Sequence, residues 1–345
     1  MKELWSYLAT SKKPIVMYGM GNGADKIIAV LEKYGRQVDD FFASDDFVRG
    51  QSFHGKKVLA FSQIKEKYED FIILVSFGSP RREVLDRVYE MSGECELYLP
   101  DVPLAGESLF DLEFYEKNLE KIRRAREIFA SERSKEIFDS IISYKLSGKI
   151  EYLRGAISSP QDDPRVLSRY KTVIDAGAYN GDTARETLEK CPDIKKIICF
   201  EPDVKNFKKL ASFAESCDRI EAINSGAWDL DETVFFGSAG NRNSNAFSGG
   251  KEIAVDMRKI DSVCEGLSVD SIKYDVEGAE MKALIGSRKT IERCLPDLKV
   301  SLYHRSEDIF EIPLYLAENY PQYKFYLVRK ECIPAWEIDL IATKR

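Results

Sequence analysis

The sequence predicts an α/β protein made of two parallel-sheet domains joined by a helical segment. Short apolar runs alternate with amphipathic stretches of helical period in two regions, near residues 15–100 and 170–320, as βαβ units require. Between them, residues 108–150 carry an apolar stripe at helical spacing among many charged residues. The length of 345 residues also exceeds what one ordinary core can use. The expected divisions are residues 1–105, 106–160 and 161–345.

The composition is that of a soluble globular protein with no preference for nucleic acid. Hydrophobic residues make up 44% of the chain and charged residues 32%, and the formal net charge is -7. No broad positive field would therefore attract a phosphate backbone. The seven cysteines are odd in number and lack C-x-x-C spacing, which predicts reduced, mostly buried thiols.

The N-terminus and the apolar runs indicate a cytoplasmic protein without a membrane span. The opening stretch "MKELWSYLATSKKP" has neither a long apolar core nor a small-residue cleavage site. No uncharged apolar stretch approaches the ~20 residues that are needed to cross a bilayer.

Each element of the first domain follows from a local pattern. Ile15–Tyr18 is a short apolar strand, and Gly19, Gly21 and Ala24 after it fit the spacing G-x-G-x-x-G/A of a turn that opens a helix. "QVDDFFAS" predicts a second strand, and "DFIILVSFGSPRREVL" repeats the plan of strand, glycine turn and helix. This alternation predicts a Rossmann-like parallel sheet.

The second domain starts near Tyr170 and alternates in the same way. Its predicted strands and helices are, in order, Val173–Asp175, Asp182–Lys190, "KKIICFEP", Val204–Ala214, "RIEAINSGAWD", "SIKYDVEG", Ala279–Ile285, "LKVSLYH" and Ile312–Asn319. A polar hairpin insertion, "TVFFGSAGNRNSNAFSGGKEIAVDMRKID", precedes "SIKYDVEG". The last strands, "YKFYLVRK" and "AWEIDLIATK", are too close in sequence for a parallel crossover and must pair antiparallel. Five β/α steps closed by an antiparallel hairpin describe a class I methyltransferase sheet.

A carboxylate and a glycine-rich turn follow the first strand of this domain, in "VIDAGAYNGDTA". Ligands bind at the carboxyl ends of the strands of an open parallel sheet, where the strand order reverses. We expect Gly177 to leave room for a ligand, because a Cβ there would occupy that space. Asp175 would repel a pyrophosphate but suits a cationic ligand such as S-adenosylmethionine. The expected cofactor-binding residues of this turn are Asp175, Gly177, Ala178, Tyr179, Asn180 and Gly181.

Two further segments are expected to bind the same cofactor. In "CFEPD", Glu201 ends the next strand, where a carboxylate can accept hydrogen bonds from both ribose hydroxyls, and Pro202 follows it. In "INSGAWD", Gly226, Ala227 and Trp228 lie in the loop that should border the adenine. Trp228 would either stack on the base or belong to the core.

Acidic residues and a histidine follow the fourth and fifth strands, where the methyl acceptor should lie. Asp275 ends the strand next to that of Asp175, and His304 follows the strand in "SLYHRSED". Both are candidates for the base that removes the acceptor proton, and an ordinary histidine pKa of about 6.5 suits that role near neutral pH. Glu277 and Glu280 could join Asp275 as Mg²⁺ ligands, but nearby positions beyond a strand end rarely converge on one ion, so no metal is expected.

The second domain resembles the FkbM family of S-adenosylmethionine-dependent methyltransferases over residues 165–345. The motifs that carry the likeness are "VIDAGAYNGDTA", "CFEPD", "SGAWD" and above all "IKYDVEGAEMKALIG". The resemblance implies a class I fold and O-methylation of a hydroxyl, commonly on a sugar or a polyketide-like product. It maps Asp175, Gly177 and Gly181 to the cofactor turn and Glu201 to the ribose. It maps Asp275 and Glu277 to the signature strand end, where both are also expected to bind the cofactor.

The first domain is similar to the N-terminal Rossmann-like domain of sugar-modifying acyltransferases, in "YGMGNGADKI" and "VSFGSPRREVL". This likeness implies a nucleotide-linked sugar, with a phosphate near the amides after Gly19 and near Arg81 or Arg82. An empty scaffold is the alternative. Asp45 and Asp46 would also permit NAD, although no residues for hydride chemistry accompany them.

Together these features predict an O-methyltransferase that acts on a saccharide or a saccharide-bearing precursor. The alternatives are a lipid or protein acceptor, or a non-enzymatic protein that senses the cofactor or serves as a scaffold in sugar assembly. The helices of residues 108–150 are expected to pack on one or both domains or to pair two chains as a homodimer.

Overall fold

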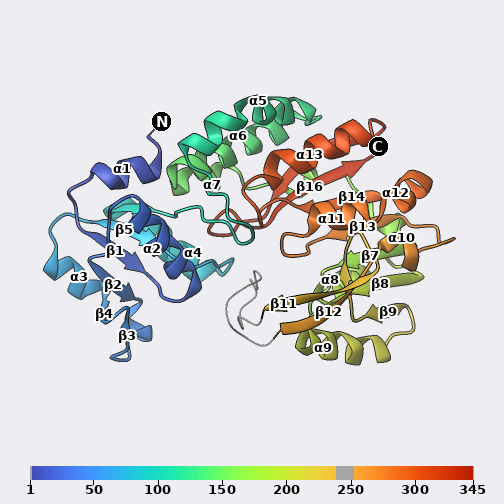
Figure 1. Cartoon of the computed structure of the whole chain (residues 1–345), viewed down its shortest axis with the longest axis horizontal. Helices are drawn as coiled ribbons and strands as arrows, with labels where there is room; N and C mark the ends of the chain where they lie inside the picture. The colour runs from blue at the N-terminus through green and yellow to red at the C-terminus, as the bar shows by residue number, and fades with distance from the viewer. Residues whose placement is uncertain (1, 238–251, 345) are drawn as a thin grey trace.

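The computed structural model describes residues 2–237 and 252–344, and its first domain is a parallel α/β unit (Figure 1). The sheet has the order β3-β4-β2-β1-β5-β6, and only β3 and β4 pair antiparallel. The strands are β1 Ile15–Tyr18, β2 Asp40–Ala43, β3 Ser52–Phe53, β4 Lys56–Ala60, β5 Ile72–Val75 and β6 Glu96–Tyr98. The helices are α1 Leu4–Thr10, α2 Asn22–Lys33, α3 Phe61–Lys67 and α4 Arg82–Glu94, with a 3₁₀ turn at Asp45–Phe47.

The central strands of this sheet are continuous apolar runs because helices cover both of their faces. Every residue of β1 and of β5 is buried, as parallel strands at the centre of such a sheet require. The short strands β3 and β4 were not predicted, since β4 begins with two exposed lysines and lacks a clear alternation. The Rossmann-like sheet itself is as predicted.

Three helices connect the two domains: α5 Leu112–Ile128, α6 Glu132–Ser147 and α7 Ile150–Gly155. Asp111 and Ser131 cap the first two, each accepting a backbone N–H of the first turn, and Gly148 ends α6 in the left-handed conformation. The backbone N–H of Ala130, between α5 and α6, donates to the carbonyl of Phe325 in the second domain. The helices therefore pack on the second domain rather than standing free between the two.

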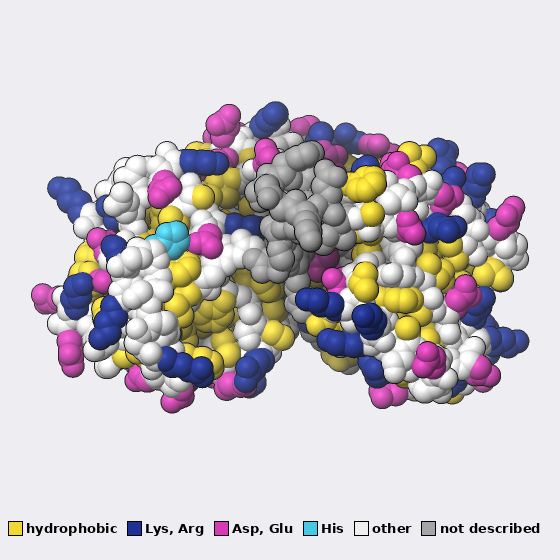
Figure 2. All heavy atoms as spheres, turned by 60° about the horizontal axis from the view of Figure 1, so that its bottom comes forward, with side chains coloured by type: hydrophobic (Ala, Val, Ile, Leu, Met, Phe, Trp, Pro, Cys, Tyr) yellow, Lys and Arg dark blue, Asp and Glu magenta, His cyan; other side chains and the backbone are white. Residues whose placement is uncertain are grey.

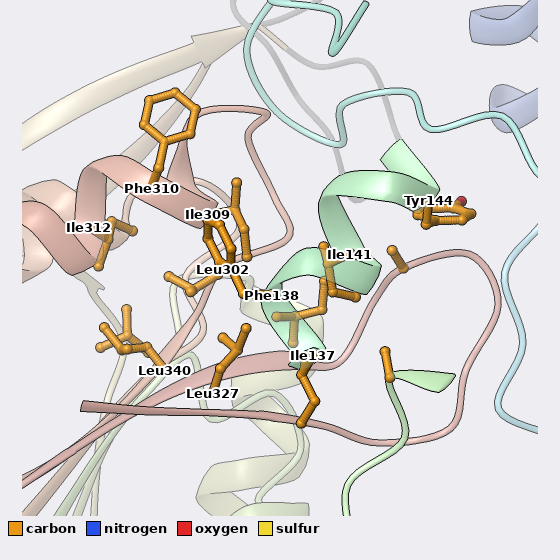
Figure 3. Close-up of a cluster of buried hydrophobic side chains, with 14 of the residues drawn as sticks. Ile137, Phe138, Ile141, Tyr144, Leu302, Ile309, Phe310, Ile312, Leu327 and Leu340 are labelled. Carbon is orange, nitrogen blue, oxygen red and sulfur yellow. The ribbon is translucent and has the colours of Figure 1, made fainter. Parts of the chain in front are cut away.

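The hydrophobic stripe of α6 forms one core with the second domain (Figure 3). Figure 3 shows its side chains directed toward a terminal strand pair and a helix of that domain. The labelled members of this cluster are Ile137, Phe138, Ile141, Tyr144, Leu302, Ile309, Phe310, Ile312, Leu327 and Leu340, all buried.

The second domain has the sheet order β15-β16-β14-β13-β7-β8-β9, in which only β16 runs antiparallel to its neighbours. The strands are β7 Thr172–Ala176, β8 Lys196–Phe200, β9 Ile220–Ile223, β13 Ser271–Tyr274, β14 Asp297–Ser301, β15 Lys324–Arg329 and β16 Ile338–Thr343. The helices are α8 Asp182–Lys190, α9 Val204–Glu215, α10 Ile260–Val263, α11 Glu280–Ile285, α12 Arg288–Cys294 and α13 Asp308–Asn319, with 3₁₀ turns at Pro160–Asp162 and Leu167–Arg169. The predicted parallel sheet with an antiparallel terminal hairpin is confirmed.

A second, small sheet contains the arms of the predicted hairpin insertion. β11 Glu232–Gly237 and β12 Glu252–Arg258 pair antiparallel, and β10 Gly226–Ala227 pairs parallel with β12. The centre of the predicted insertion, residues 238–251, lies outside the described residues.

Loops at the carboxyl ends of the two sheets contact each other (Figure 1). Ser79, after β5, exchanges two backbone hydrogen bonds with Ile333, between β15 and β16. Gly78 lies so close to the ring of Trp336 that an added Cβ would stand 2.0 Å from it. Figure 2 shows the two domains as lobes with a furrow between them. The loops at the carboxyl ends of the two sheets therefore meet.

The state of the cysteines and the character of the helices can be compared with the predictions from the sequence. All seven cysteines carry free thiols, as predicted. Over residues 2–237 and 252–344, no helix combines the length and the apolar character that crossing a membrane would need.

Truncating Phe138 tests how far α6 belongs to the core of the second domain. We expect Phe138→Ala to lower the free energy of unfolding by about 3–5 kcal/mol, because the side chain is 1% exposed and leaves a cavity. Denaturant unfolding monitored by circular dichroism measures the change. The exposed neighbour Glu136, varied to Ala, should shift stability by less than about 0.5 kcal/mol. Equal effects of the two variants would contradict the shared core.

Candidate functional site

The glycine turn after β7 is shaped by its contact with the neighbouring strand. Gly177 has φ +87°, and a Cβ there would lie 1.8 Å from the carbonyl oxygen of Asp275. We expected Gly177 to leave room for a ligand. Instead, the backbone carbonyl of Asp275 occupies the space beside it, so a contact within the protein requires a glycine at this position. The N–H groups of Gly177 and Ala178 both donate to the carbonyl of Phe200, at 3.0 and 2.9 Å, which fixes the turn over β8.

Asp175, at the end of β7, is buried and paired with a lysine. Its side chain is 1% exposed, and the Nζ of Lys273 lies 3.0 Å from Oδ1. Lys273 is the register partner of Asp175 on β13, so the two side chains share one face of the sheet. Burial raises the pKa of Asp175, and the charge of Lys273 opposes that rise. Asp175 is thus a buried carboxylate that already has one cationic partner within the protein.

Lys273 joins both strand-end carboxylates and was missed in the sequence. Its Nζ also lies 3.2 Å from the carbonyl oxygen of Gly177 and 3.6 Å from Oδ2 of Asp275. Burial would lower the pKa of Lys273, but the charges of Asp175 and Asp275 raise it, so the ammonium is kept. The signal in the sequence was a charged lysine inside the otherwise uncharged strand "SIKY".

Glu201 turns its carboxylate back toward the glycine turn. Oε2 accepts the N–H of Tyr179 and Oε1 accepts the N–H of Asp203, both at 2.8 Å. Burial raises the pKa of Glu201 to about 7, although the amides of Asp203 and Tyr179 lower it. The group therefore changes charge near neutral pH.

The loop expected to border an adenine is ordered by packing. A Cβ on Gly226 would lie 2.4 Å from Sδ of Met257, so this glycine serves the contact between β10 and β12. Trp228 donates its Nε1–H to Glu232 at 3.1 Å, and the Nζ of Lys282 lies 3.9 Å from the ring centroid. The indole is half-buried and covered by a cation, and its stacking on a base stays a prediction.

Asp275 and His304 come together at the ends of β13 and β14, as predicted from parallel pairing. His304 is 1% exposed, and its Nε2 lies 3.7 Å from Oδ1 of Asp275 and 3.6 Å from Oε2 of Glu277. On the other side of the ring, Nδ1 lies 2.9 Å from Oε1 of Glu280. Tyr303 donates its hydroxyl to Oδ1 of Asp275 at 3.1 Å. Asp275 is 31% exposed in its side chain, so it is accessible to solvent whereas His304 is not.

The carboxylates around His304 change its charge. Burial would lower the pKa of His304, but Glu280, Asp275 and Glu277 raise it to about 9. The expectation of an ordinary histidine pKa was therefore wrong, because three acidic side chains surround this ring. Burial would likewise raise the pKa of Asp275, but Lys273 and His304 hold it below its usual range. In this arrangement Asp275 is the ionised group and His304 carries a proton at neutral pH.

The carboxylates beyond β13 converge, contrary to the reasoning from their spacing. Glu277 and Gly278 are both left-handed, with φ of +55° and +96°, and turn the chain back toward the strand end. Glu280 then starts α11 with its Oε1 accepting the N–H of Val276 at 2.8 Å. As a result, ligand atoms of Asp275, Glu280 and His304 lie within 4.8 Å of one another.

The segment that follows β6 forms a wall beside this cluster. The N–H of Ala105 donates to the carbonyl of His304 at 2.8 Å, and Ser306 donates its hydroxyl to the carbonyl of Ser108 at 2.6 Å. A Cβ on Gly278 would stand 2.4 Å from Cβ of Ala105. Lys26 of α2 holds the same segment through the carbonyls of Pro103 and Leu104. Residues between the domains therefore contact the backbone of His304 itself.

Removing the lysine between the strand ends tests whether it neutralises them. We expect Lys273→Met to lower the free energy of unfolding by about 3–5 kcal/mol, because it leaves the buried Asp175 carboxylate without its partner. Denaturant unfolding measures the loss, and adding Asp175→Asn should recover part of it. The exposed pair of Lys171 and Asp193 provides the control, since Lys171→Met should cost less than about 1 kcal/mol. No recovery in the double variant would contradict the pairing.

Comparisons with known proteins agree with this geometry. Residues 175–325 match the model of the Methyltransferase FkbM domain. No curated protein matches the chain. The solved structure of methyltransferase FkbM from Methylobacillus flagellatus is 17% identical, covers 96% of this chain and 90% of its own, and superposes with a TM-score of 0.70.

Other solved structures align with about half of the chain. An rRNA methylase from Streptococcus thermophilus is 14% identical over 52% of this chain and 89% of its own, with a TM-score of 0.35. Fibrillarin from Aeropyrum pernix is 13% identical over 52% of this chain and 69% of its own, also with a TM-score of 0.35. The similarity to the Methylobacillus flagellatus structure extends over both domains and shows a shared fold. Residues 175–325 of this chain thus match the FkbM methyltransferase domain, and the fold is the one shared with the Methylobacillus flagellatus structure.

Proposed function

We propose that the protein methylates a hydroxyl of a saccharide or of a saccharide-bearing precursor. The observation that carries this proposal is the polar wall beside the donor turn. The side chain of Asp275 is partly exposed there and that of Glu277 is well exposed. The Tyr303 hydroxyl and the His304 ring lie next to them. Carboxylates and hydroxyls accept and donate the hydrogen bonds that a polyol offers, whereas a lipid acceptor would need an apolar wall.

The residues of the donor turn suit the cofactor. Oδ2 of Asp175 and Oδ1 of Asn180 are buried acceptors that lack a hydrogen-bond partner within the described part of the chain. An ammonium group is the donor that such oxygens need. We assign the turn from Asp175 to Gly181, Glu201 with Pro202, and the loop from Gly226 to Trp228 to cofactor binding. When bound, S-adenosylmethionine supplies an electrophilic methyl group.

Asp275 is the residue that we propose as the proton acceptor. It ends β13 next to the donor turn, and its two oxygens are held by Tyr303 and Lys273. Positioning the hydroxyl against the donor would supply most of the acceleration, and the carboxylate would take the proton as the new bond forms. His304, fixed by its backbone contact with Ala105, orders this side of the site.

The first domain is proposed to hold the remainder of the acceptor. Gly21, with φ +96°, starts α2 in open space, since an added Cβ would meet nothing within 4 Å. Arg82 is engaged by Asp86 and by Glu331 of the second domain, while Arg81 pairs with Glu83 at the surface. A nucleotide-linked sugar at this turn stays a prediction, as does a homodimer.

The role of Asp275 is tested by Asp275→Asn, which keeps the shape of the side chain and removes the base. We expect kcat to fall by about 10²–10⁴-fold while the Kd for S-adenosylmethionine stays within a few-fold. Transfer of labelled methyl groups into a saccharide fraction of the source cell measures the rate, and calorimetry measures the affinity. Asp218→Asn serves as the control, because it removes the same charge from a side chain that is exposed. Full turnover by the Asp275 variant would remove this residue from the mechanism.

Glu201 predicts a pH dependence of cofactor affinity. Its pKa is about 7, and the ionised carboxylate is the stronger acceptor for two ribose hydroxyls, because both of its oxygens are free of a proton and carry charge. The affinity for S-adenosylmethionine should therefore rise with pH, becoming roughly tenfold tighter at pH 8 than at pH 6. Calorimetric titration across this range measures the effect.

Glu201→Gln provides the matched control, because the amide accepts hydrogen bonds but does not titrate. This variant should bind more weakly and should lose most of the change in affinity between pH 6 and pH 8. A wild-type profile that is flat over this range, or one that the variant retains in full, would contradict the assignment of Glu201 to the ribose.

A further inference from the structure

Three side chains from two adjacent strand ends form a compact set of metal ligands. Asp275 follows β13, Glu280 begins α11 and His304 follows β14, and one ligand atom from each lies within 4.8 Å of the others. The side chains of Glu280 and His304 are each 1% exposed, while that of Asp275 is 31% exposed. Two of the three ligands are therefore buried, and the third is accessible to solvent.

One buried oxygen of this set lacks a hydrogen bond. Oε1 of Glu280 accepts the backbone N–H of Val276 and forms an ion pair with Nδ1 of His304 at 2.9 Å. Oε2 of Glu280 has no hydrogen-bond partner among residues 2–237 and 252–344. Buried polar atoms are normally satisfied, so this oxygen indicates a ligand that the chain does not supply.

The charges around the cluster favour a cation. Asp275, Glu277 and Glu280 surround the imidazole of His304. The imidazole carries a proton in the absence of an ion, and a bound ion would displace that proton. The other positive groups nearby are directed elsewhere. Lys273 lies against Oδ2 of Asp275, on the side of Asp175, and Arg305 donates its Nε–H to the carbonyl of Gly278 at 2.7 Å.

We propose that Asp275, Glu280 and His304 bind a divalent transition-metal ion of the Mn²⁺ class. Two carboxylates and one imidazole form a donor set that such ions accept, and three ligands leave further coordination positions open. Those positions lie on the side of Asp275, which is accessible to solvent, and vicinal hydroxyls of a saccharide can chelate the ion there. This last step rests on the proposed function, whereas the ion site itself does not.

Metal binding and proton transfer are compatible at Asp275. Oδ1 lies on the His304 side, at 3.7 Å from Nε2, while Oδ2 lies on the Lys273 side. Binding through Oδ1 leaves Oδ2 to take a proton from a hydroxyl whose acidity the ion has increased. The sequence-based expectation of no metal is revised here, because the left-handed pair Glu277 and Gly278 brings Glu280 back to the strand end.

The test uses the full chain, stripped of metal with a chelator, and Mn²⁺ alone as the probe. We expect one Mn²⁺ per chain by calorimetry and by loss of the free-ion signal in electron paramagnetic resonance. Pulsed measurements should show coupling to a nitrogen nucleus, since the imidazole is a ligand. Neither readout needs the acceptor, so a wrong acceptor class would not affect them.

Variants separate this site from unspecific binding to acidic groups. Glu280→Gln retains the carbonyl that accepts Val276, and His304→Asn removes the nitrogen donor. Each should weaken Mn²⁺ binding by more than about tenfold, and His304→Asn should also abolish the nitrogen coupling. Glu265→Gln removes the same charge from an exposed side chain, and this variant should bind Mn²⁺ like the wild type. Retained affinity for S-adenosylmethionine shows that each variant is folded.

Two results would overturn the proposal. One is the absence of stoichiometric binding of Mn²⁺ to the folded wild-type chain. The other is binding without nitrogen coupling that Glu280→Gln and His304→Asn leave unchanged. Methyl transfer at the full rate after chelation would reject the role of the ion in the reaction while leaving the proposed O-methylation intact.

Discussion

The ammonium of Lys273 between two strand-end carboxylates is the interaction on which the rest of the site depends. Parallel pairing of β7 with β13 puts Lys273 opposite Asp175, and Asp275 lies two residues further along the chain from Lys273. Two carboxylates so close to each other at a buried edge would repel each other. Lys273 bridges them at 3.0 and 3.6 Å and also contacts the carbonyl of Gly177. The lysine therefore fixes the charge of the site and its geometry together.

The close approach of the two strand ends has a second consequence, for the chain that follows β13. Gly177 admits the carbonyl of Asp275 where any other residue would collide with it. The chain then turns through Glu277 and Gly278 and returns Glu280 to His304. The carboxylate of Glu280, five residues after Asp275, thus lies close to Asp275 again. One backbone contact accounts for the donor turn and for the cluster on the acceptor side.

The two domains are joined in a way that makes the first one part of the site. The segment after β6 donates a hydrogen bond to the backbone of His304, and Lys26 of α2 holds that segment from the other side. The hairpin loop of the second domain reaches the loop after β5 through Ser79 and Ile333. The helix α6 packs into the core of the second domain (Figure 3). Both domains therefore contribute contacts around the ends of the strands that carry the site.

The sequence by itself determined the order of the elements and the residues at the strand ends. Alternating apolar strands and helical stripes specified both parallel sheets, and parallel pairing placed Asp175, Glu201, Asp275 and His304 at one edge, because carboxyl ends of parallel strands meet there. Only the tertiary structure decided their charge states and partners. The lysine beside Asp175, the three acids around His304 and the return of Glu280 depend on contacts between distant segments and on left-handed residues. Local periodicity carries no information about either, since it reports which face of an element is buried and not what lies against it.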